Sequence, residues 1–152
     1  MADPEEDKTI GQGAFGAVFR AADLETDGPD VAIKVLFSRY HEDKKVLQRF
    51  NQEAKLLKVL DHPSIATAYQ SRADADMAFL VMELIDGISL DKRCVSHSED
   101  GRHLPKGGIA WICDQLCGAV DFAHQKGVIH RDLKPRNVMV NRPGARPFVK
   151  VL

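Results

Sequence analysis

Three short strand patterns follow one another at the start of the chain, and only turns separate them. The strands are predicted over Lys8–Ile10, Ala17–Ala21 and the β-branched run Val31–Phe37. A glycine-rich turn, Gly11–Gly16, joins the first two, and a polar turn, Asp23–Asp30, joins the next two. Strands joined by short turns pair antiparallel, so this part of the chain predicts an antiparallel meander.

A long amphipathic helix is predicted next, over about 43–60. Its apolar face is formed by side chains at helical spacing, namely Val46, Phe50, Leu57 and Leu60. Two further strands, near 65–70 and 77–84, are expected to flank a polar hairpin turn. The first half of the chain is therefore expected to be a sheet with one helix.

The second half predicts a different mixture of elements. A polar loop is expected over 96–108, followed by a second long helix that ends at Gly127 as its C′ residue. The apolar stripe of that helix consists of Ile109, Ile112, Leu116, Val120 and Ala123. A short strand at 128–129 and a hairpin of 138–140 with 148–152 are predicted to follow.

Composition excludes several classes of protein. Of 152 residues, 44% are hydrophobic and 28% charged, which is typical of a soluble globular chain. The 21 Lys and Arg nearly cancel the 22 Asp and Glu, so no overall field recruits nucleic acid or an anionic membrane. The apolar run Met77–Met82 is too short to cross a bilayer, and Met1–Lys8 is acidic where a signal peptide is basic. A cytoplasmic protein is expected.

Basic residues are concentrated after His124, where seven of them face a single acid, Asp132. A solvated basic surface and a site for a polyanion both remain open on charge alone. Cys94, Cys113 and Cys117 form no C-x-x-C motif, and the six histidines are scattered. No disulfide framework or zinc site is predicted, and we expect reduced, buried thiols.

The segment from Gly11 to Val18 has the pattern G-x-G-x-x-G-x-V, with its glycines at 11, 13 and 16. Glycine lets backbone N–H groups approach a phosphate closely, because no Cβ stands in the way. A dinucleotide-binding fingerprint is the main rival, but it needs an acid at the end of the next strand. Asp30 precedes that strand instead. A plain glycine turn without a ligand also stays open.

Lys34 lies inside the strand pattern Val-Ala-Ile-Lys-Val, where it could simply be the solvent-facing half of an alternation. Glu53 shares a helical face with Phe50 and Leu57, so a carboxylate interrupts an apolar stripe. An unpaired carboxylate there would cost several kcal/mol, which predicts a cationic partner. Lys34 is placed to supply it.

The most specific segment is His130–Val138, His-Arg-Asp-Leu-Lys-Pro-Arg-Asn-Val. It matches the H-R-D-L-x-x-x-N motif of protein kinases. Lys34 and Glu53 match the positions of that family's ion pair, and the glycine segment precedes them in the family's order. On these features the sequence resembles a protein kinase, and the stretch 49–65 is similar to the eukaryotic-like Ser/Thr kinases of bacteria.

The resemblance implies that ATP and Mg²⁺ are bound. The glycine loop would cover the ATP phosphates, Lys34 would contact the α- and β-phosphates, and Glu53 would orient Lys34. Met82 would be the gatekeeper, followed by a hinge that includes Glu83 and Ile85. The other residues expected around the nucleotide are Ile10, Gly11, Gly13, Gly16, Val18, Ala32 and Met139.

The resemblance also assigns catalytic roles. Asp132 would accept the proton of the substrate hydroxyl or orient its oxygen, and Asn137 would bind a metal ion. Lys134 would meet the transferring phosphate, and its presence is typical of Ser/Thr kinases, so a protein substrate with a Ser or Thr acceptor is implied. Arg131 resembles the arginine that binds a phosphate on the activation loop.

The implied fold is α+β, with a kinase-like N-lobe of antiparallel sheet plus one long helix over 1–86 and an incomplete helical C-lobe over 87–152. The chain stops at the strand that leads into the family's Asp-Phe-Gly, so we expect this fragment to be inactive alone. We also expect exposed apolar surface on the helix 109–126. A nucleotide- or partner-binding pseudokinase module is the alternative, and Lys134 disfavours a small-molecule phosphotransferase.

Overall fold

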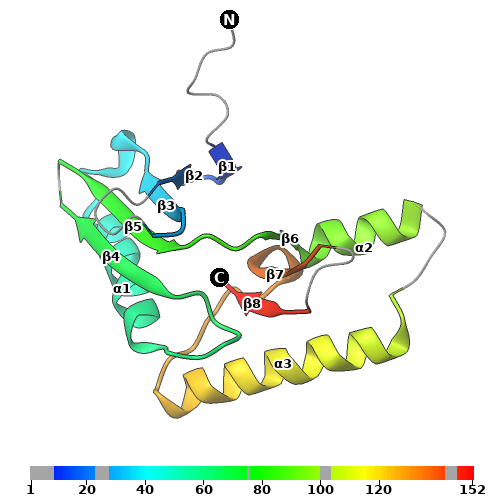
Figure 1. The fold of residues 1–152 in the computed structure, drawn as a ribbon. Helices are drawn as coiled ribbons and strands as arrows, with labels where there is room; N and C mark the ends of the chain where they lie inside the picture. The colour runs from blue at the N-terminus through cyan, green and yellow to red at the C-terminus, as the bar shows by residue number, and fades with distance from the viewer. Residues whose placement is uncertain (1–8, 23–27, 75, 100–103, 143–146) are drawn as a thin grey trace, which may run out of the picture. The chain divides into compact units, whose positions relative to one another are not determined.

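The computed structural model describes most of the chain, namely residues 9–22, 28–74, 76–99, 104–142 and 147–152. The described residues form two compact units (Figure 1). The first unit contains those of 1–59 and 67–84, and the second contains those of 60–66 and 85–152.

The first unit is built on a five-stranded sheet with the order β1-β2-β3-β5-β4, in which every neighbouring pair is antiparallel. Its strands are β1 (Thr9–Gln12), β2 (Gly16–Ala21), β3 (Val31–Leu36), β4 (Ala68–Ala73) and β5 (Ala78–Glu83). The predicted meander is confirmed, because β1, β2 and β3 are neighbours in chain order. Residues 65–67, predicted to start β4, precede it, and the part of the turn 23–30 at 23–27 lies outside the described residues.

The glycine segment is partly strand, which differs from the predicted turn over 11–16. Gly11 and Gln12 belong to β1 and pair with Val18 and Ala17 of β2. Gly16 lies against β3 so closely that an added Cβ would be 2.1 Å from the carbonyl oxygen of Val35. Only glycine fits there, because real Cβ atoms do not approach a backbone oxygen so closely.

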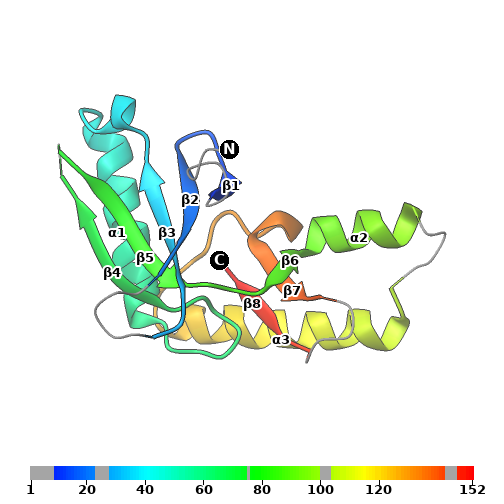
Figure 2. The same ribbon diagram turned by 45° about the horizontal axis from the view of Figure 1, so that its top comes forward.

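Helix α1 (Lys44–Val59) lies along one face of this sheet (Figures 1 and 2). It begins where the Asp43 carboxylate accepts hydrogen bonds from the backbone N–H groups of Lys45 and Val46, which is an N-cap. Phe50 and Ala54 of α1 form the core of this unit with Leu36, Ala78 and Leu80 of the sheet. The predicted helix and the role of Phe50 in its apolar face are confirmed.

The second unit contains a small antiparallel sheet with the order β6-β7-β8. Its strands are β6 (Gly87–Ser89), β7 (Val138–Asn141) and β8 (Val149–Val151). The buried valines Val138, Val140 and Val149 pack with Ile112 and Leu116 of helix α3 (Lys106–Gln125). The predicted hairpin near 138 and 148 is confirmed.

Helix α3 ends as the sequence predicts. Gly127 has φ 74°, its N–H bonds the carbonyl of His124, and the N–H of Val128 bonds the carbonyl of Ala123. These two bonds form a Schellman motif with Gly127 at C′. The strand predicted at 128–129 is wrong, because the Val128 N–H is used by this cap and no described strand includes the pair.

The polar loop predicted over 96–108 is also wrong in part. Helix α2 (Leu90–Glu99) occupies its first residues, and α3 already begins at Lys106. Leu90 packs on the valine cluster of the small sheet, and α2 contacts β6, β7 and the short 3-10 turn η3 (Pro135–Asn137). Packing of Leu90 on the small sheet therefore helps to hold α2 in place.

The segment 60–66 packs with the second unit through β8. The N–H of Ala66 bonds the carbonyl of Val151 at 2.8 Å, and the N–H of Val151 bonds the carbonyl of Ser64 at 2.9 Å. The buried Ser64 hydroxyl also donates to Oε1 of Gln115 in α3 at 3.2 Å. These bonds attach the end of the chain to the loop that follows α1.

The prediction of buried thiols is wrong, because Cys94, Cys113 and Cys117 are all exposed. Cys113 and Cys117 lie on α3, next in sequence to Ile112 and Leu116, which pack on the sheet. The expected exposed apolar surface on α3 is present at Ile109 and Trp111.

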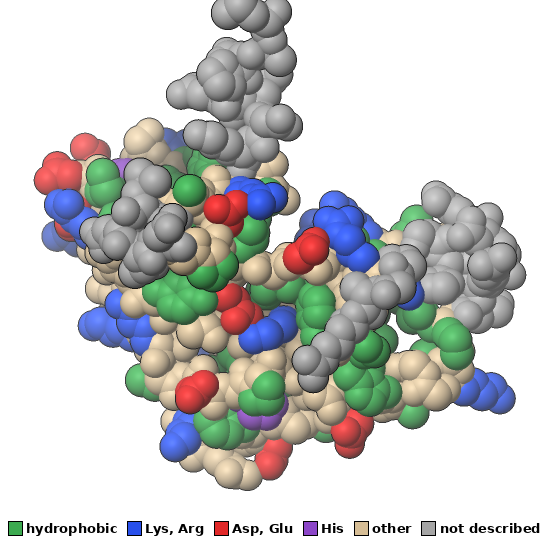
Figure 3. Space-filling model, viewed as in Figure 1, with side chains coloured by type: hydrophobic (Ala, Val, Ile, Leu, Met, Phe, Trp, Pro, Cys, Tyr) green, Lys and Arg blue, Asp and Glu red, His purple; other side chains and the backbone are tan. Residues whose placement is uncertain are grey.

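Basic and acidic side chains are interspersed on the face of the described residues shown in Figure 3. No helix among the described residues has the length and apolar character needed to span a membrane.

Candidate functional site

The residues predicted to surround a nucleotide fall in both units. In the first unit, Val18 lies opposite Lys34, and Ala32 lies opposite Met82. Directly opposed residues of neighbouring strands point to the same face, and so do alternate residues of one strand. These four side chains therefore share one face of the sheet, the face on which α1 packs through Leu36 and Leu80.

Lys34 and Glu53 form an ion pair, with Nζ 2.6 Å from Oε1. The pair was expected because burying an unpaired carboxylate is costly, but Glu53 is not buried. The Glu53 side chain keeps 47% of its surface exposed, and the Lys34 side chain keeps 35%. Such a half-exposed pair contributes about 0–1 kcal/mol to stability. The contact therefore positions the ammonium group of Lys34. It does not neutralise a buried charge.

The turn of the glycine segment is held by two kinds of contact. The N–H of Gly13 bonds the carbonyl of Gly16 at 2.9 Å, which closes the turn. The Phe15 ring packs against Tyr40 with centroids 5.2 Å apart, in the 3-10 turn η2 (Ser38–Tyr40). Gly11 and Gly13 have room around them, with no atom closer than 3.9 Å to an added Cβ, and Ile10 is 51% exposed.

The other predicted nucleotide residues are Glu83, in the first unit, and Ile85 and Met139, in the second. Glu83 ends β5, and its N–H bonds the carbonyl of Thr67 at 2.9 Å. Ile85 belongs to the second unit, where its carbonyl accepts the N–H of Gly87 at 2.9 Å. Met139 lies in β7 of the same unit, opposite Ser89 of β6, and is half-buried.

The predicted catalytic loop begins at His130, whose two ring nitrogens are both bonded. Its Nδ1 accepts the backbone N–H of Asp132 at 3.2 Å, and its Nε2 lies 2.8 Å from the carbonyl oxygen of Leu152. Because Nδ1 is an acceptor, Nε2 carries the proton. The imidazole thereby joins the loop to the residue that follows β8.

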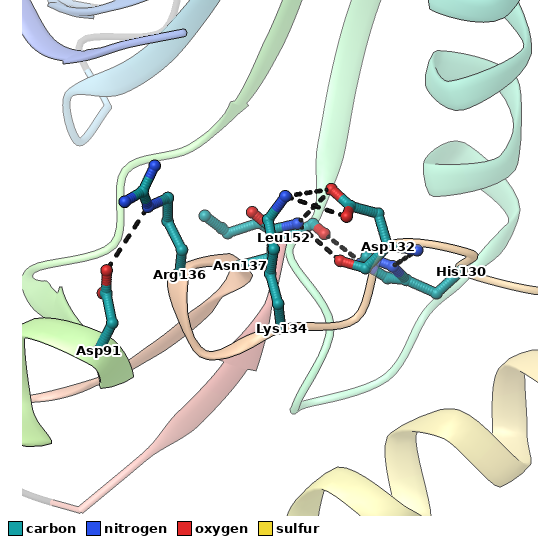
Figure 4. Close-up of polar contacts among 7 residues, drawn as sticks. All are labelled: Asp91, His130, Asp132, Lys134, Arg136, Asn137 and Leu152. Carbon is teal, nitrogen blue, oxygen red and sulfur yellow. Dashed lines mark hydrogen bonds and ion pairs between the residues drawn. The ribbon is translucent and has the colours of Figure 1, made fainter.

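Lys134 and Asn137 both turn toward the carboxylate of Asp132 (Figure 4). Nζ of Lys134 is 2.9 Å from Oδ1 and 2.7 Å from Oδ2. Nδ2 of Asn137 donates to Oδ2 at 3.0 Å and to the backbone carbonyl of Asp132 at 2.8 Å. Pro135 starts the turn η3 between these two residues, and the N–H of Asn137 bonds the carbonyl of Lys134, so the turn fixes both donors.

These donors hold the pKa of Asp132 below its usual value. The hydrogen bond from Lys134 has the largest effect, followed by that from Asn137. Both bonds favour the ionised form of the carboxylate. Asp132 is consequently an exposed carboxylate that stays charged at neutral pH and accepts hydrogen bonds.

Asn137 fits the predicted role of metal ligand. Its amide nitrogen makes the two bonds to Asp132, so its carbonyl oxygen is directed elsewhere. Carboxamide oxygen is a hard donor of the kind that Mg²⁺ prefers. Among the described residues no three His, Cys, Asp or Glu side chains gather into a metal-binding group.

Sequence reasoning missed the ion pair between Arg136 of η3 and Asp91 of α2. Their Nε and Oδ2 atoms are 3.5 Å apart, and Figure 4 shows Arg136 turned toward Asp91 rather than toward Asp132. No local signal could have revealed this pair, because α2 itself was predicted as loop in part and the partners are distant in the chain.

The family model of the protein kinase domain matches residues 5–152. Serine/threonine-protein kinase Pkn1 of Myxococcus xanthus is 34% identical over 146 residues, which are 95% of this chain and 20% of the relative. Serine/threonine-protein kinase PknB of Mycolicibacterium smegmatis is 37% identical over 147 residues, covering 94% and 22%. The chain thus spans about a fifth of the length of these curated relatives.

A crystal structure of the PknI kinase domain of Mycobacterium tuberculosis superposes with a TM-score of 0.77 at 26% identity. The match covers 95% of this chain and 56% of that one. Sequence and fold agree, and the chain belongs to the protein kinase domain family.

Proposed function

We propose that this chain is the nucleotide- and acceptor-binding part of a serine/threonine protein kinase, which moves the γ-phosphate of ATP to a Ser or Thr hydroxyl of a protein. The arrangement of Lys134 and Asn137 around Asp132, at 2.7 and 3.0 Å, is the observation that carries the proposal. The names of its relatives from Myxococcus and Mycolicibacterium point to the same activity.

In this proposal Asp132 accepts a hydrogen bond from the acceptor hydroxyl and aims its oxygen at the γ-phosphorus. A carboxylate with a lowered pKa is a weak base, so orientation is its main contribution. The oxygen–phosphorus bond forms as the bond to the ADP oxygen breaks, and the hydroxyl proton passes to Asp132 once the oxygen has become acidic. Lys134 stabilises the negative charge on the phosphoryl oxygens during transfer.

The first unit would hold the nucleotide. Lys34, oriented by Glu53, would donate to phosphate oxygens, and the backbone of Gly11 and Gly13 would lie over the phosphates. From this unit, apolar contact with the base and backbone contact at its edge would come from Ile10, Gly16, Val18, Ala32, Met82 and Glu83. Mg²⁺, when bound through Asn137, would neutralise charge on the phosphates.

The test is transfer of labelled γ-phosphate from ATP to Ser and Thr peptides by the protein that carries this chain. Asp132→Ala and Lys34→Met should each lower the rate at least about 10²-fold, because each removes a group that meets the reacting phosphate or oxygen. Arg72→Gln, which removes a surface ion pair with Asp74 in the first unit, is the control and should leave the rate unchanged.

Calorimetry with ATP and Mg²⁺ separates the alternatives. Nucleotide binding without transfer would favour the pseudokinase module over an active kinase. Absence of both binding and transfer would contradict the proposal altogether.

A further inference from the structure

The tip of the glycine segment, residues 13–16, has few constraints of its own. Its turn is closed by the bond from the N–H of Gly13 to the carbonyl of Gly16, and Gly13, Ala14 and Phe15 are all exposed. Glycine adds backbone freedom, because it populates more of φ/ψ space than other residues. Such a tip needs contacts from outside it to stay in one conformation.

These contacts come from the end of β3 and from η2, which follows it. The N–H of Phe37 bonds the carbonyl of Phe15 at 2.9 Å, one step beyond the last paired residues of β2 and β3. The Phe15 and Tyr40 rings lie with centroids 5.2 Å apart and planes tilted by 59°, a geometry that aromatic pairs favour. The Tyr40 hydroxyl also donates to the carbonyl oxygen of Ala14 at 3.4 Å. The tip is therefore attached to 37–40.

Arg39 adds to the same attachment. Its Nη2 lies 3.4 Å from the carbonyl oxygen of Ala14, and its guanidinium carbon lies 5.1 Å from the centre of the Tyr40 ring and 4.8 Å from that of Phe37. Guanidinium groups stack favourably on aromatic rings. Both bonds to Ala14 are long for hydrogen bonds, at 3.4 Å, so the contact between the Phe15 and Tyr40 rings contributes most.

Tyr40 is itself fixed, which makes it a firm support for the tip. Its half-buried ring packs against the core of the first unit, which contains Leu36 and Phe50. The next residue, His41, places its ring Nε2 3.0 Å from the carbonyl oxygen of Leu36. The N–H of Asp43, the N-cap of α1, bonds the carbonyl of Tyr40 at 3.1 Å. Tyr40 therefore connects the core to the exposed tip.

We propose that Tyr40 is a positioning residue of the nucleotide site, which holds the tip through Phe15 so that its backbone is ordered before ATP binds. The inference rests on the proposed function, in which the backbone of Gly11 and Gly13 lies over the phosphates. A tip that is already ordered loses less conformational freedom when a phosphate binds, and this strengthens binding. Tyr40 acts through Phe15 and needs no contact with the nucleotide.

Calorimetry with ATP and Mg²⁺, and separately with adenosine, tests this inference in the protein that carries this chain. Tyr40→Ala should weaken ATP binding about three- to tenfold, the effect expected for the loss of one aromatic pair. Adenosine has no phosphate for the tip to cover, so its affinity should not change. Tyr40→Phe keeps the ring and should restore the ATP affinity. An equal loss for ATP and adenosine would overturn the inference, because a general effect on the fold would explain it.

Phe15→Ala removes the other ring of the pair. Its side chain is 53% exposed, so this variant leaves the core intact where Tyr40→Ala could disturb it. Phe15→Ala should weaken ATP binding at least as much, and adding Tyr40→Ala to it should cause no further loss. Additive losses would overturn the inference. The control is Tyr69→Ala, which removes an exposed tyrosine of β4 in the same unit and should leave the ATP affinity unchanged.

Amide hydrogen exchange in the nucleotide-free protein separates this inference from the proposed function. Tyr40→Ala should raise the exchange rates of the Gly13 and Phe37 N–H groups about three- to tenfold, because both are bonded to carbonyls of the tip. The N–H of Ile33, in the middle of β3, should exchange at the same rate as before. Faster exchange at Gly13 and Phe37 in a protein that binds no ATP would contradict the proposed function and still support the attachment through Tyr40. Unchanged exchange there would overturn the inference, even in a protein that binds ATP.

Discussion

Arg131 adopts a backbone conformation that disfavours every residue except glycine. Its φ of 62° is the only positive value at a non-glycine position among the described residues. The left-handed region costs an L-residue roughly 1–2 kcal/mol relative to glycine, and more when the side chain is β-branched. The loop that positions Asp132 therefore holds strain in the preceding residue.

This strain predicts an order of stability. Arg131→Gly should have a free energy of unfolding about 1–2 kcal/mol higher than Arg131→Val, measured by chemical denaturation. At Arg72, within strand β4, the order should be reversed, because valine favours strands and glycine does not. An Arg131→Val variant as stable as Arg131→Gly would show that the loop relaxes out of this conformation.

A second prediction concerns the acidity of Asp132. Lys134→Ala removes the largest cause of the lowered pKa, so the pKa of Asp132 should rise toward 3.8. The control is Asp74, whose pKa is lowered mainly by Arg72 and should not respond. Carboxyl ¹³C chemical shifts followed during an acid titration report both groups, and an unchanged Asp132 would contradict the assigned cause.

The sign of the corresponding effect on stability follows from the direction of the shift. The folded pKa of Asp132 is lower than the unfolded one, so its favourable contribution is complete above about 3.8 and is lost as pH falls through the folded value. Asp132 therefore contributes no pH dependence to stability near neutral pH.

At the scale of elements, helix α1 is held by one buried aromatic ring. Phe50 is 6% exposed in the core with Leu36 and Leu80, whereas Val59 at the end of the same helix is 60% exposed. Phe50→Ala should lower the free energy of unfolding by about 3–5 kcal/mol, because it leaves a cavity under the sheet.

Val59→Ala is the control on the same helix and should change stability by about 0.5 kcal/mol or less. Far-UV circular dichroism during denaturation measures both variants. Comparable losses in the two would mean that α1 does not dock through the Phe50 face.

Elements with a strong periodic pattern could be predicted from the sequence, and elements fixed by packing could not. The helix around Phe50 and the helix closed by Gly127 each carry both a stripe and an end signal. Helix α2 was not predicted, although Asp91 lies in its first turn, and its Leu90 packs on the small sheet. The burial of Cys113 and Cys117 was predicted wrongly. Whether a side chain of α3 is buried depends on which face of the helix packs on the small sheet.

At the scale of the whole molecule, the sequence indicates chemistry through local motifs but does not reveal contacts between distant segments. Asp132, Lys134 and Asn137 lie within one short loop, so the motif alone predicts that their side chains are close together. The pair of Arg136 with Asp91, and the bonds of Ser64 with Val151, join segments that no spacing rule connects.

Gly16 lies very close to the carbonyl oxygen of Val35, and this affects how relatives that have lost nucleotide binding should be compared. This glycine is required by the Val35 carbonyl of its own sheet, so it would persist in a paralogue that had lost every use for nucleotides. Gly11 and Gly13 are not crowded in this way, and substitutions there would be tolerated by the fold once nucleotide binding no longer mattered. Among paralogues that have lost nucleotide binding, substitutions should therefore occur first at Gly11 and Gly13. Gly16 should be retained, and its presence says nothing about nucleotide binding.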